Sequence, residues 1–181
     1  MEKPSIPLRR NKARARLPLC ARDAHGVRRV IAVTPRPGLR GQMACALGAD
    51  ALIASEGCED LVEAVRSVNH GRLPSVVIEA TGKPEAIGEV FRAAGVGARV
   101  LLLGIFHRQA ACDPAQIIRK ELHISGSFCY NWDDFEASLD LIARGLVHTT
   151  PLITHRLPLA RIGDALSLIQ KREAVKVMLE P

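Results

Sequence analysis

Residues 76–104, VVIEATGKPEAIGEVFRAAGVGARVLLLG, are the stretch of sequence that decides the fold. They begin with the apolar run Val76–Ile78 and end with a second run, Val100–Leu103. Between the runs, apolar residues recur at helical spacing from Ile87 to Ala94, with a proline near the start and a glycine at the end. Continuous apolar runs are typical of parallel strands covered on both faces. The stretch therefore predicts a strand–helix–strand unit of a parallel sheet.

The same alternation of apolar runs and helical segments extends in both directions along the chain. Repeated strand–helix–strand units with short links imply right-handed crossovers and an open, doubly wound parallel sheet. We therefore predict the α/β fold class. The further segments are the strands Val30–Val33, Ala51–Ala54, His123–Phe128 and Val175–Leu179, and the helices around Leu61–Val68, Asp133–Gly145 and Ile162–Ile169.

Two carboxylates open one of these helices, Asp133 and Glu136. A close pair of acids can serve acid–base chemistry, but three residues is also the spacing of a capping box. We expect Asp133 to cap the helix N-terminus, with Glu136 three residues on.

The positive charge is concentrated at the N-terminus. The net charge is +6, but residues 1–40 hold 11 Lys/Arg against two acids, whereas residues 41–181 hold 14 against 17. We expect residues 1–24 to form a basic leader, disordered over residues 1–12, ahead of one domain spanning residues 25–181. A basic arm is a feature of nucleic-acid-binding proteins, yet residues 1–24 contain no aromatic to stack on bases, so we do not expect that function.

Composition excludes several other classes of protein. No apolar run approaches the roughly 18–20 residues that span a membrane, and no secretory signal is evident. The number of cysteines is odd and none forms a C-x2-C pair, which favours free thiols in a reducing cytoplasm. His148 and His155 lie seven residues apart, so the histidines do not have metal-site spacing either, and we name no metal ligand. The cysteines are Cys20, Cys45, Cys58, Cys112 and Cys129.

Several short motifs occur in an order that points to one family. They are Gly48-Ala49-Asp50, Glu79-Ala80-Thr81-Gly82, Val100-Leu101-Leu102-Leu103-Gly104, Lys120-Glu121-Leu122 followed by Gly126-Ser127, Pro151-Leu152-Ile153-Thr154-His155, and Lys176-Val177-Met178-Leu179-Glu180-Pro181. Together they cover about residues 26–181 and resemble the medium-chain, zinc-type alcohol, polyol and threonine dehydrogenases. The resemblance implies a Rossmann-type nucleotide-binding domain of an oxidoreductase that acts on an alcohol CH–OH group with NAD or NADP.

The sequence departs from the family at its beginning. The family's nucleotide domain opens with a strand and a G-x-G-x-x-G turn that binds the pyrophosphate. Upstream of Val30 this chain has only Gly26. We therefore expect an N-terminally truncated chain whose sheet lacks its first strand and Gly-rich turn, and whose zinc-containing catalytic domain is missing. We name no catalytic residue.

The alternative to a truncated enzyme is a non-catalytic nucleotide-binding or dimerisation module that works with a separate catalytic chain.

The resemblance also assigns residues to the adenosine end of the cofactor. An acid at the end of the second strand binds the adenine ribose, whereas a neutral residue with nearby arginine accepts the 2′-phosphate of NADP. Thr34 occupies this position, and Arg36 and Arg40 follow it. The residues therefore favour NADP over NAD; the alternative is that Arg36 is a solvated loop charge.

Further positions match the rest of the family's cofactor site. Each has a simpler alternative: a strand-to-helix turn, core packing, or an exposed lysine. The resemblance places Ala80, Thr81 and Gly82 at the adenine-side wall, Leu103, Gly104, Ile105 and Ser125 beside the nicotinamide, where their backbone groups would hold the carboxamide, and Lys176 near the pyrophosphate.

The strand Leu122–Ser127 is predicted to be the outer edge of the sheet. In the family this edge pairs with its copy across a two-fold axis, so the resemblance implies a homodimer.

Loss of the first strand would remove the centre of the sheet. Because net stabilities are only roughly 5–15 kcal/mol, we expect that loss to destabilise the domain heavily.

Overall fold

A computed structural model describes residues 28–181 of the chain. The expected leader, Cys20 and Gly26 lie outside these residues. The chain divides into two compact units. The first contains residues 60–140, and the second contains the described residues up to Glu59 together with residues 141–181. Each unit is described by itself.

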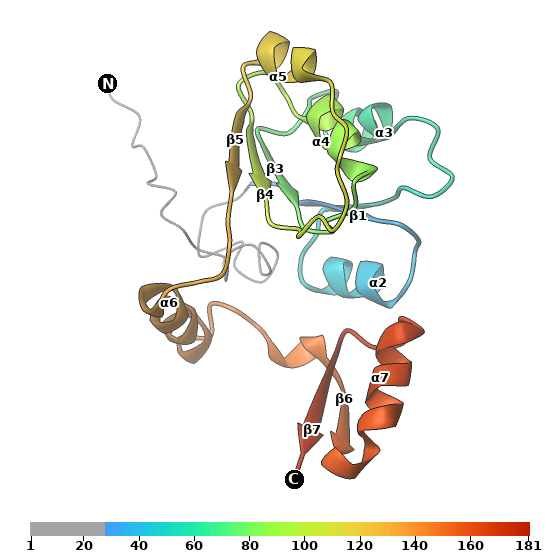
Figure 1. The fold of residues 1–181 in the computed structure, drawn as a ribbon, viewed down its shortest axis with the longest axis vertical. Coiled ribbons are helices and arrows are strands. Elements are labelled where there is room, and N and C mark those ends of the chain that lie inside the picture. Colours follow the sequence, from blue (N-terminus) through green and yellow to red (C-terminus); the bar gives the residue numbers. More distant parts are fainter. Residues whose placement is uncertain (1–27) are drawn as a thin grey trace. The chain divides into compact units, whose positions relative to one another are not determined.

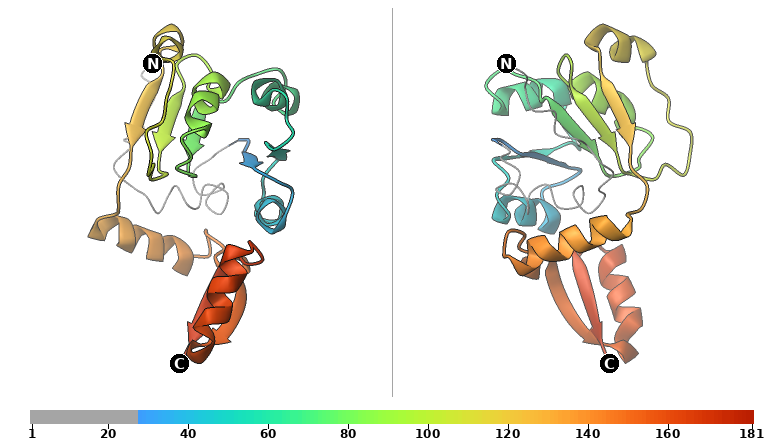
Figure 2. Two further views of the ribbon diagram at one scale, coloured as in Figure 1. Left: turned by 45° about the vertical axis from the view of Figure 1, so that its right-hand side comes forward. Right: turned by 90° about the vertical axis from the view of Figure 1, so that its left-hand side faces the viewer.

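The first unit is built on a three-stranded parallel sheet (Figure 1). Its strands are β3 (Val76–Glu79), β4 (Arg99–Leu102) and β5 (His123–Gly126), in the order β3-β4-β5. Val77 lies in register with Val100, and Val100 with Ile124. The parallel strands predicted from the apolar runs are therefore confirmed. Figure 2 shows β5 at the end of the row, next to β4 alone, as expected for an edge strand.

Three helices connect or flank these strands: α3 (Leu61–Val68), α4 (Ala86–Ala93) and α5 (Pro114–Lys120). The predicted helices at 61–68 and 87–94 are confirmed within a residue. We did not predict α5, which is only seven residues long. The Asp113 carboxylate accepts from the Ala115 amide at 2.9 Å, and Pro114 provides the fixed φ angle of a first helical turn.

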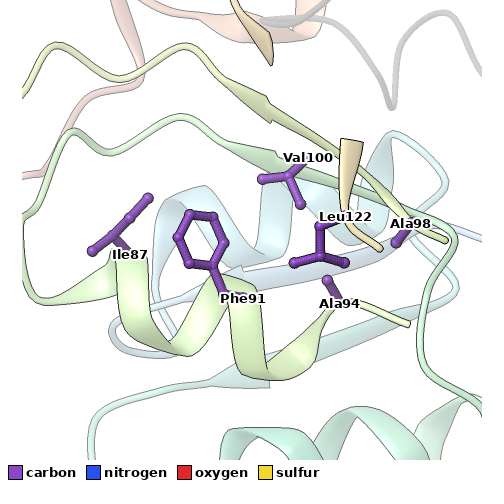
Figure 3. Close-up of a cluster of buried hydrophobic side chains, with 6 residues drawn as sticks. All are labelled: Ile87, Phe91, Ala94, Ala98, Val100 and Leu122. Atoms are coloured by element: carbon purple, nitrogen blue, oxygen red, sulfur yellow. The ribbon is translucent and has the colours of Figure 1, made fainter. Parts of the chain in front are cut away.

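The core of the first unit lies between α4 and the sheet. Phe91 and Val100 are 3% and 0% exposed, and the close-up in Figure 3 shows Ile87, Phe91 and Ala94 along one side of α4. Leu122 reaches the same cluster from the residue before β5. The helical spacing in the sequence thus produces one buried stripe, and the stripe holds α4 on the sheet.

Helix α6 (Trp132–Ala143) begins differently from our expectation. Its cap is Asn131: the Asn131 side chain accepts from the Asp134 amide at 2.8 Å, and the Asp134 carboxylate accepts from the Asn131 amide at 3.2 Å. The predicted cap at Asp133 with Glu136 is therefore wrong by two residues. The physical pattern is the expected reciprocal one, but asparagine begins it and the 5%-exposed Asp134 completes it.

The second unit contains two strand–helix–strand segments. In the first, β1 (Ile31–Thr34) and β2 (Ala51–Ala54) pair in parallel and α2 (Leu39–Ala46) connects them. In the second, β6 (Ile153–Pro158) and β7 (Lys176–Glu180) pair in parallel around α7 (Ile162–Gln170). Two 3-10 turns, η2 (Thr150–Leu152) and η3 (Leu159–Arg161), flank β6.

Among the described residues the strands form three separate sheets. The first unit holds one of them, β3-β4-β5, and the second unit holds the pairs β1–β2 and β6–β7.

Candidate functional site

A buried glutamate at the end of β3 organises the candidate site. Glu79 is only 3% exposed. Its carboxylate accepts from the Thr81 amide at 2.7 Å, from the Thr81 hydroxyl, and from the Gly82 amide at 3.0 and 3.1 Å. Burial of a charged group is costly unless such donors satisfy it. These bonds fold the turn 80–82 back over the end of its own strand.

The same residue also fixes the turn after β4. The carbonyl oxygen of Glu79 accepts from the amides of Leu103 and Gly104, at 2.8 and 3.1 Å. Two turns from neighbouring parallel strands are thus tied to a single residue, at the carboxyl edge of the sheet. Ligands bind at this edge in open α/β sheets.

Two glycines allow these turns to touch. Gly82 has φ +67°, and a Cβ there would lie 2.8 Å from the carbonyl carbon and 2.9 Å from the nitrogen of Ile105. A Cβ on Gly104 would collide with the Gly82 backbone and with the Glu79 carboxylate. Neither position accepts a larger residue without movement of backbone. This close approach explains why both positions hold glycine.

The structure brings six of the predicted residues together here: Ala80, Thr81 and Gly82 in one turn, and Leu103, Gly104 and Ile105 in the other. Ser125 lies on the adjacent strand β5, exposed and in register with Leu101. The amides of Leu103 and Gly104 are used by Glu79, whereas the Leu103 carbonyl accepts no hydrogen bond within the described residues. The Leu103 carbonyl is therefore available to accept a hydrogen bond from a ligand.

The predicted adenosine-end residues belong to the second unit. Thr34 ends β1, as expected, and its hydroxyl donates to the Arg36 carbonyl at 3.1 Å. The Arg36 guanidinium forms an ion pair with Glu56, and the hydrogen bond that it donates to this carboxylate raises the pKa of Arg36. Arg40 is exposed on α2 and has no ion pair within residues 28–181. The turn after β1 therefore presents a paired cation, and the first turn of α2 presents an unpaired one.

Lys176 is the first residue of β7 and is exposed. Its carbonyl accepts from the Thr154 hydroxyl at 3.2 Å, which fixes the start of the strand against β6. The structure does not gather Lys176 with the turns after β3 and β4 within one unit.

Two acidic residues, Glu79 and Glu56, contact the candidate site residues but were not predicted from the sequence. Glu79 could have been found, because a single acid ends an otherwise apolar strand and precedes the Thr-Gly turn. No sequence pattern of this kind marks Glu56 as a site residue. It lies 20 residues from Arg36 and becomes its partner only because β1 and β2 are adjacent.

No group of three or more metal-ligating side chains occurs in the described part of the chain. The cysteines there are free thiols. Within the same residues, no helix has the length and apolarity that crossing a membrane requires.

Comparisons with known proteins agree with this geometry. The family model for zinc-binding dehydrogenases matches residues 19–144. The chain is 37% identical over 145 residues to an L-threonine 3-dehydrogenase of Symbiobacterium thermophilum, covering 78% of this chain and 41% of the relative. It is 29% identical to the sorbitol dehydrogenase of Gallus gallus, with coverages of 83% and 42%. The chain therefore spans less than half the length of these relatives.

Solved structures show the same likeness. An alcohol dehydrogenase from Thermotoga maritima superposes with a TM-score of 0.78 at 27% identity, over 90% of this chain and 46% of that one. A short chain alcohol dehydrogenase of Escherichia coli CFT073, in complex with NADH, gives a TM-score of 0.80 at 27% identity, over 90% and 48%. The predicted Rossmann-type fold is confirmed.

Proposed function

Because the chain belongs to the zinc-binding dehydrogenase family, we propose that it binds a nicotinamide dinucleotide, with the turns after β3 and β4 at its nicotinamide end. The family reaction is the oxidation of an alcohol CH–OH group, and a bound nicotinamide supplies the hydride acceptor. We assign this chain the binding and orientation of the cofactor, over a domain of residues 25–181, and assign it no catalytic residue. Fold alone does not identify the alcohol.

The two glycine turns support the proposal. Gly82 and Gly104 remove side chains from the carboxyl edge, so backbone groups form its surface. The carboxamide of a nicotinamide needs acceptors for its NH2 group, and the Leu103 carbonyl offers one beside the exposed Ile105. Glu79 acts through these turns, because its carboxylate and carbonyl hold both of them. It is a positioning residue.

The charges after β1 support a phosphorylated adenosine end. Arg40 has no ion-pair partner in the described chain, and Thr34 places no carboxylate where the unphosphorylated ribose would be bound. Glu56 neutralises Arg36 until an anion replaces it. We therefore favour NADP, with the 2′-phosphate in competition with Glu56 for the Arg36 guanidinium.

The deciding experiment is a titration of the full chain with NADPH and with NADH, followed by nicotinamide fluorescence and calorimetry. We expect saturable binding with NADPH preferred. Gly104→Ala should abolish it, because the new Cβ displaces the Gly82 turn. Gly88→Ala, with no atom within 4 Å of the added Cβ, is the matched control and should bind normally. A chain that unfolds cooperatively yet binds neither dinucleotide would refute the proposal.

A separate substitution tests the preference for NADPH over NADH. Glu56→Gln removes the competing carboxylate while it preserves shape, so the ratio of NADPH to NADH affinity should rise about threefold to tenfold, the scale of one exposed charge interaction. An unchanged ratio would mean that Arg36 takes no part in cofactor choice.

We also propose that the free edge of β5 pairs with its copy in a homodimer. The amides of His123 and Ser127 donate to carbonyls on the β4 side, at 2.9 and 3.1 Å, so the amide of Gly126 faces away from β4. Gly126→Pro removes this outward donor and should convert a dimer into monomers in sedimentation analysis. A monomeric parent chain would contradict the proposal.

The second candidate function is a non-catalytic nucleotide-binding or dimerisation module that works with a separate catalytic chain. Co-purification of a partner carrying Cys/His zinc ligands would establish this arrangement.

A further inference from the structure

An open cavity of about 390 Å³ lies at the other end of the first unit's sheet. It is lined by Arg66 at the end of α3, by the segment 71–75 that leads into β3, and by Gly95 and Val96 ahead of β4. These segments precede their strands, so the cavity is at the amino edge, opposite the turns proposed to bind the nucleotide. Its volume is within the range of small-molecule sites.

A tightly bonded turn builds the rim of this cavity. The Arg66 carbonyl accepts from the amides of Asn69 and Gly71, at 3.0 and 2.8 Å. The Asn69 side chain then donates to the Arg72 carbonyl at 2.9 Å. His70 and Gly71 adopt positive φ angles of 53° and 75°, which reverse the chain. The backbone of this turn places both Arg66 and Arg72 in the lining of the same cavity.

The arginines of the rim carry uncompensated charge. Neither the Arg66 nor the Arg72 guanidinium has an ion pair or a hydrogen bond within the described residues. Ser75, also on the rim, has a hydroxyl that makes no hydrogen bond there either. Two guanidinium forks and one hydroxyl donor around a cavity match the acceptors of a phosphate group.

A third cation strengthens the positive field. The Lys120 ammonium donates to the carbonyls of Phe91, Arg92 and Ala94, at 3.1, 2.7 and 3.0 Å. Burial lowers the pKa of Lys120, and the charges of Arg66 and Arg92 lower it further. The positive charge of Arg66 therefore acts on Lys120. A bound anion would relieve this repulsion.

We propose that this cavity is a second site, which binds the phosphate group of a small molecule between Arg66 and Arg72. The site is independent of the proposed dinucleotide function, because it uses neither of the glycine turns.

The test uses the full chain, labelled with ¹⁵N and titrated with inorganic phosphate at constant ionic strength. We expect saturable shifts of the amides at residues 71–75 and 95–96. Arg66→Gln and Arg72→Gln should each weaken binding by about tenfold to a hundredfold, the scale of a hydrogen bond to a charged group. Lys171→Gln, an exposed lysine of the second unit, makes the same change of charge and should leave the affinity unchanged. Amide spectra show that each variant is folded.

Three outcomes would overturn the proposal. The first is shifts that do not saturate or that spread over many exposed basic residues. The second is an affinity that neither arginine variant reduces. The third is preferential binding of duplex DNA with a steep salt dependence, which would make the rim part of a nucleic-acid surface. The double variant Arg66→Gln/Arg72→Gln should retain NADPH binding, and Gly104→Ala should retain phosphate binding, so the two proposals fail separately.

Discussion

Two helices with the same sequence pattern have different environments in the two units. In α4, Ile87 and Phe91 are 5% and 3% exposed. In α7, Ile162 and Leu166 have the equivalent four-residue spacing but are 49% and 55% exposed, and only Ala165 of that helix is buried. Helix α4 packs in a unit of three strands with α3 and α5, whereas α7 belongs to a pair of strands. Periodicity identifies a helix, but the number of elements around it decides how much of the stripe is buried.

A second contrast concerns the last residues of two strands. Glu79 ends β3 and is buried, with its carboxylate bonded to the following turn. Glu180 ends β7 and is exposed, and its carboxylate pairs with Arg156 at 2.7 Å. The same residue type at the same place in a strand thus organises a turn in one unit and forms a surface ion pair in the other.

The largest expected effect is in the packed helix. Phe91→Ala should reduce the free energy of unfolding of the first unit by about 3–5 kcal/mol, because it removes a buried ring and leaves a cavity. Leu166→Ala on α7 should cost less than about 1 kcal/mol. Amide hydrogen exchange at Val100 and at Val177 reports each unit separately. Equal losses would mean that the exposed face of α7 is covered in solution.

The second largest difference in stability is expected between substitutions of the two strand-terminal glutamates. Glu79→Ala leaves the Thr81 and Gly82 amides without their acceptor and should cost about 1.5–3 kcal/mol. Glu180→Ala removes an exposed ion pair and should cost about 0–1 kcal/mol. Urea unfolding measures both changes, and dinucleotide titration should show a loss of affinity for Glu79→Ala alone. A neutral Glu79→Ala variant would show that the turns after β3 and β4 hold without the carboxylate.

The smallest contrast is between two lysines near helix C-termini. Lys120→Gln loses an ammonium bonded to three carbonyls at the end of α4 and should destabilise the first unit by about 1 kcal/mol. Lys171→Gln, at the cap of α7, should change stability by less than about 0.5 kcal/mol. The midpoints of thermal unfolding distinguish these values. Identical shifts would indicate that Lys120 acts only through its charge.

Most of the regular elements could be predicted because they depend on local pattern. The run Ala51–Ala54 matches β2, and the run at Val30–Val33 matches β1 displaced by one residue. Helix α5 could not be predicted from the sequence, because seven residues are too few to establish a helical period. The cap of α6 was misplaced because Asn, Asp and Ser are nearly equivalent as caps, and only the backbone path selects Asn131.

The candidate site divides in the same way. Its residues in the turns after β3 and β4 could be proposed from the sequence, because they match positions of the cofactor site in the family that the sequence resembles. The ion pair of Arg36 with Glu56 could not, since it joins residues that only the pairing of β1 with β2 brings together.

By itself the sequence determined most of the strands and helices, the parallel character of the strands, and the family to which the chain belongs, because periodicity and motif order are properties of neighbouring residues. Only the tertiary structure decided that Glu79 is buried and Glu180 exposed, that Gly82 and Gly104 touch, and that Arg66 and Arg72 share a cavity. These are contacts between distant residues, and their energies depend on what surrounds each group and not on its type.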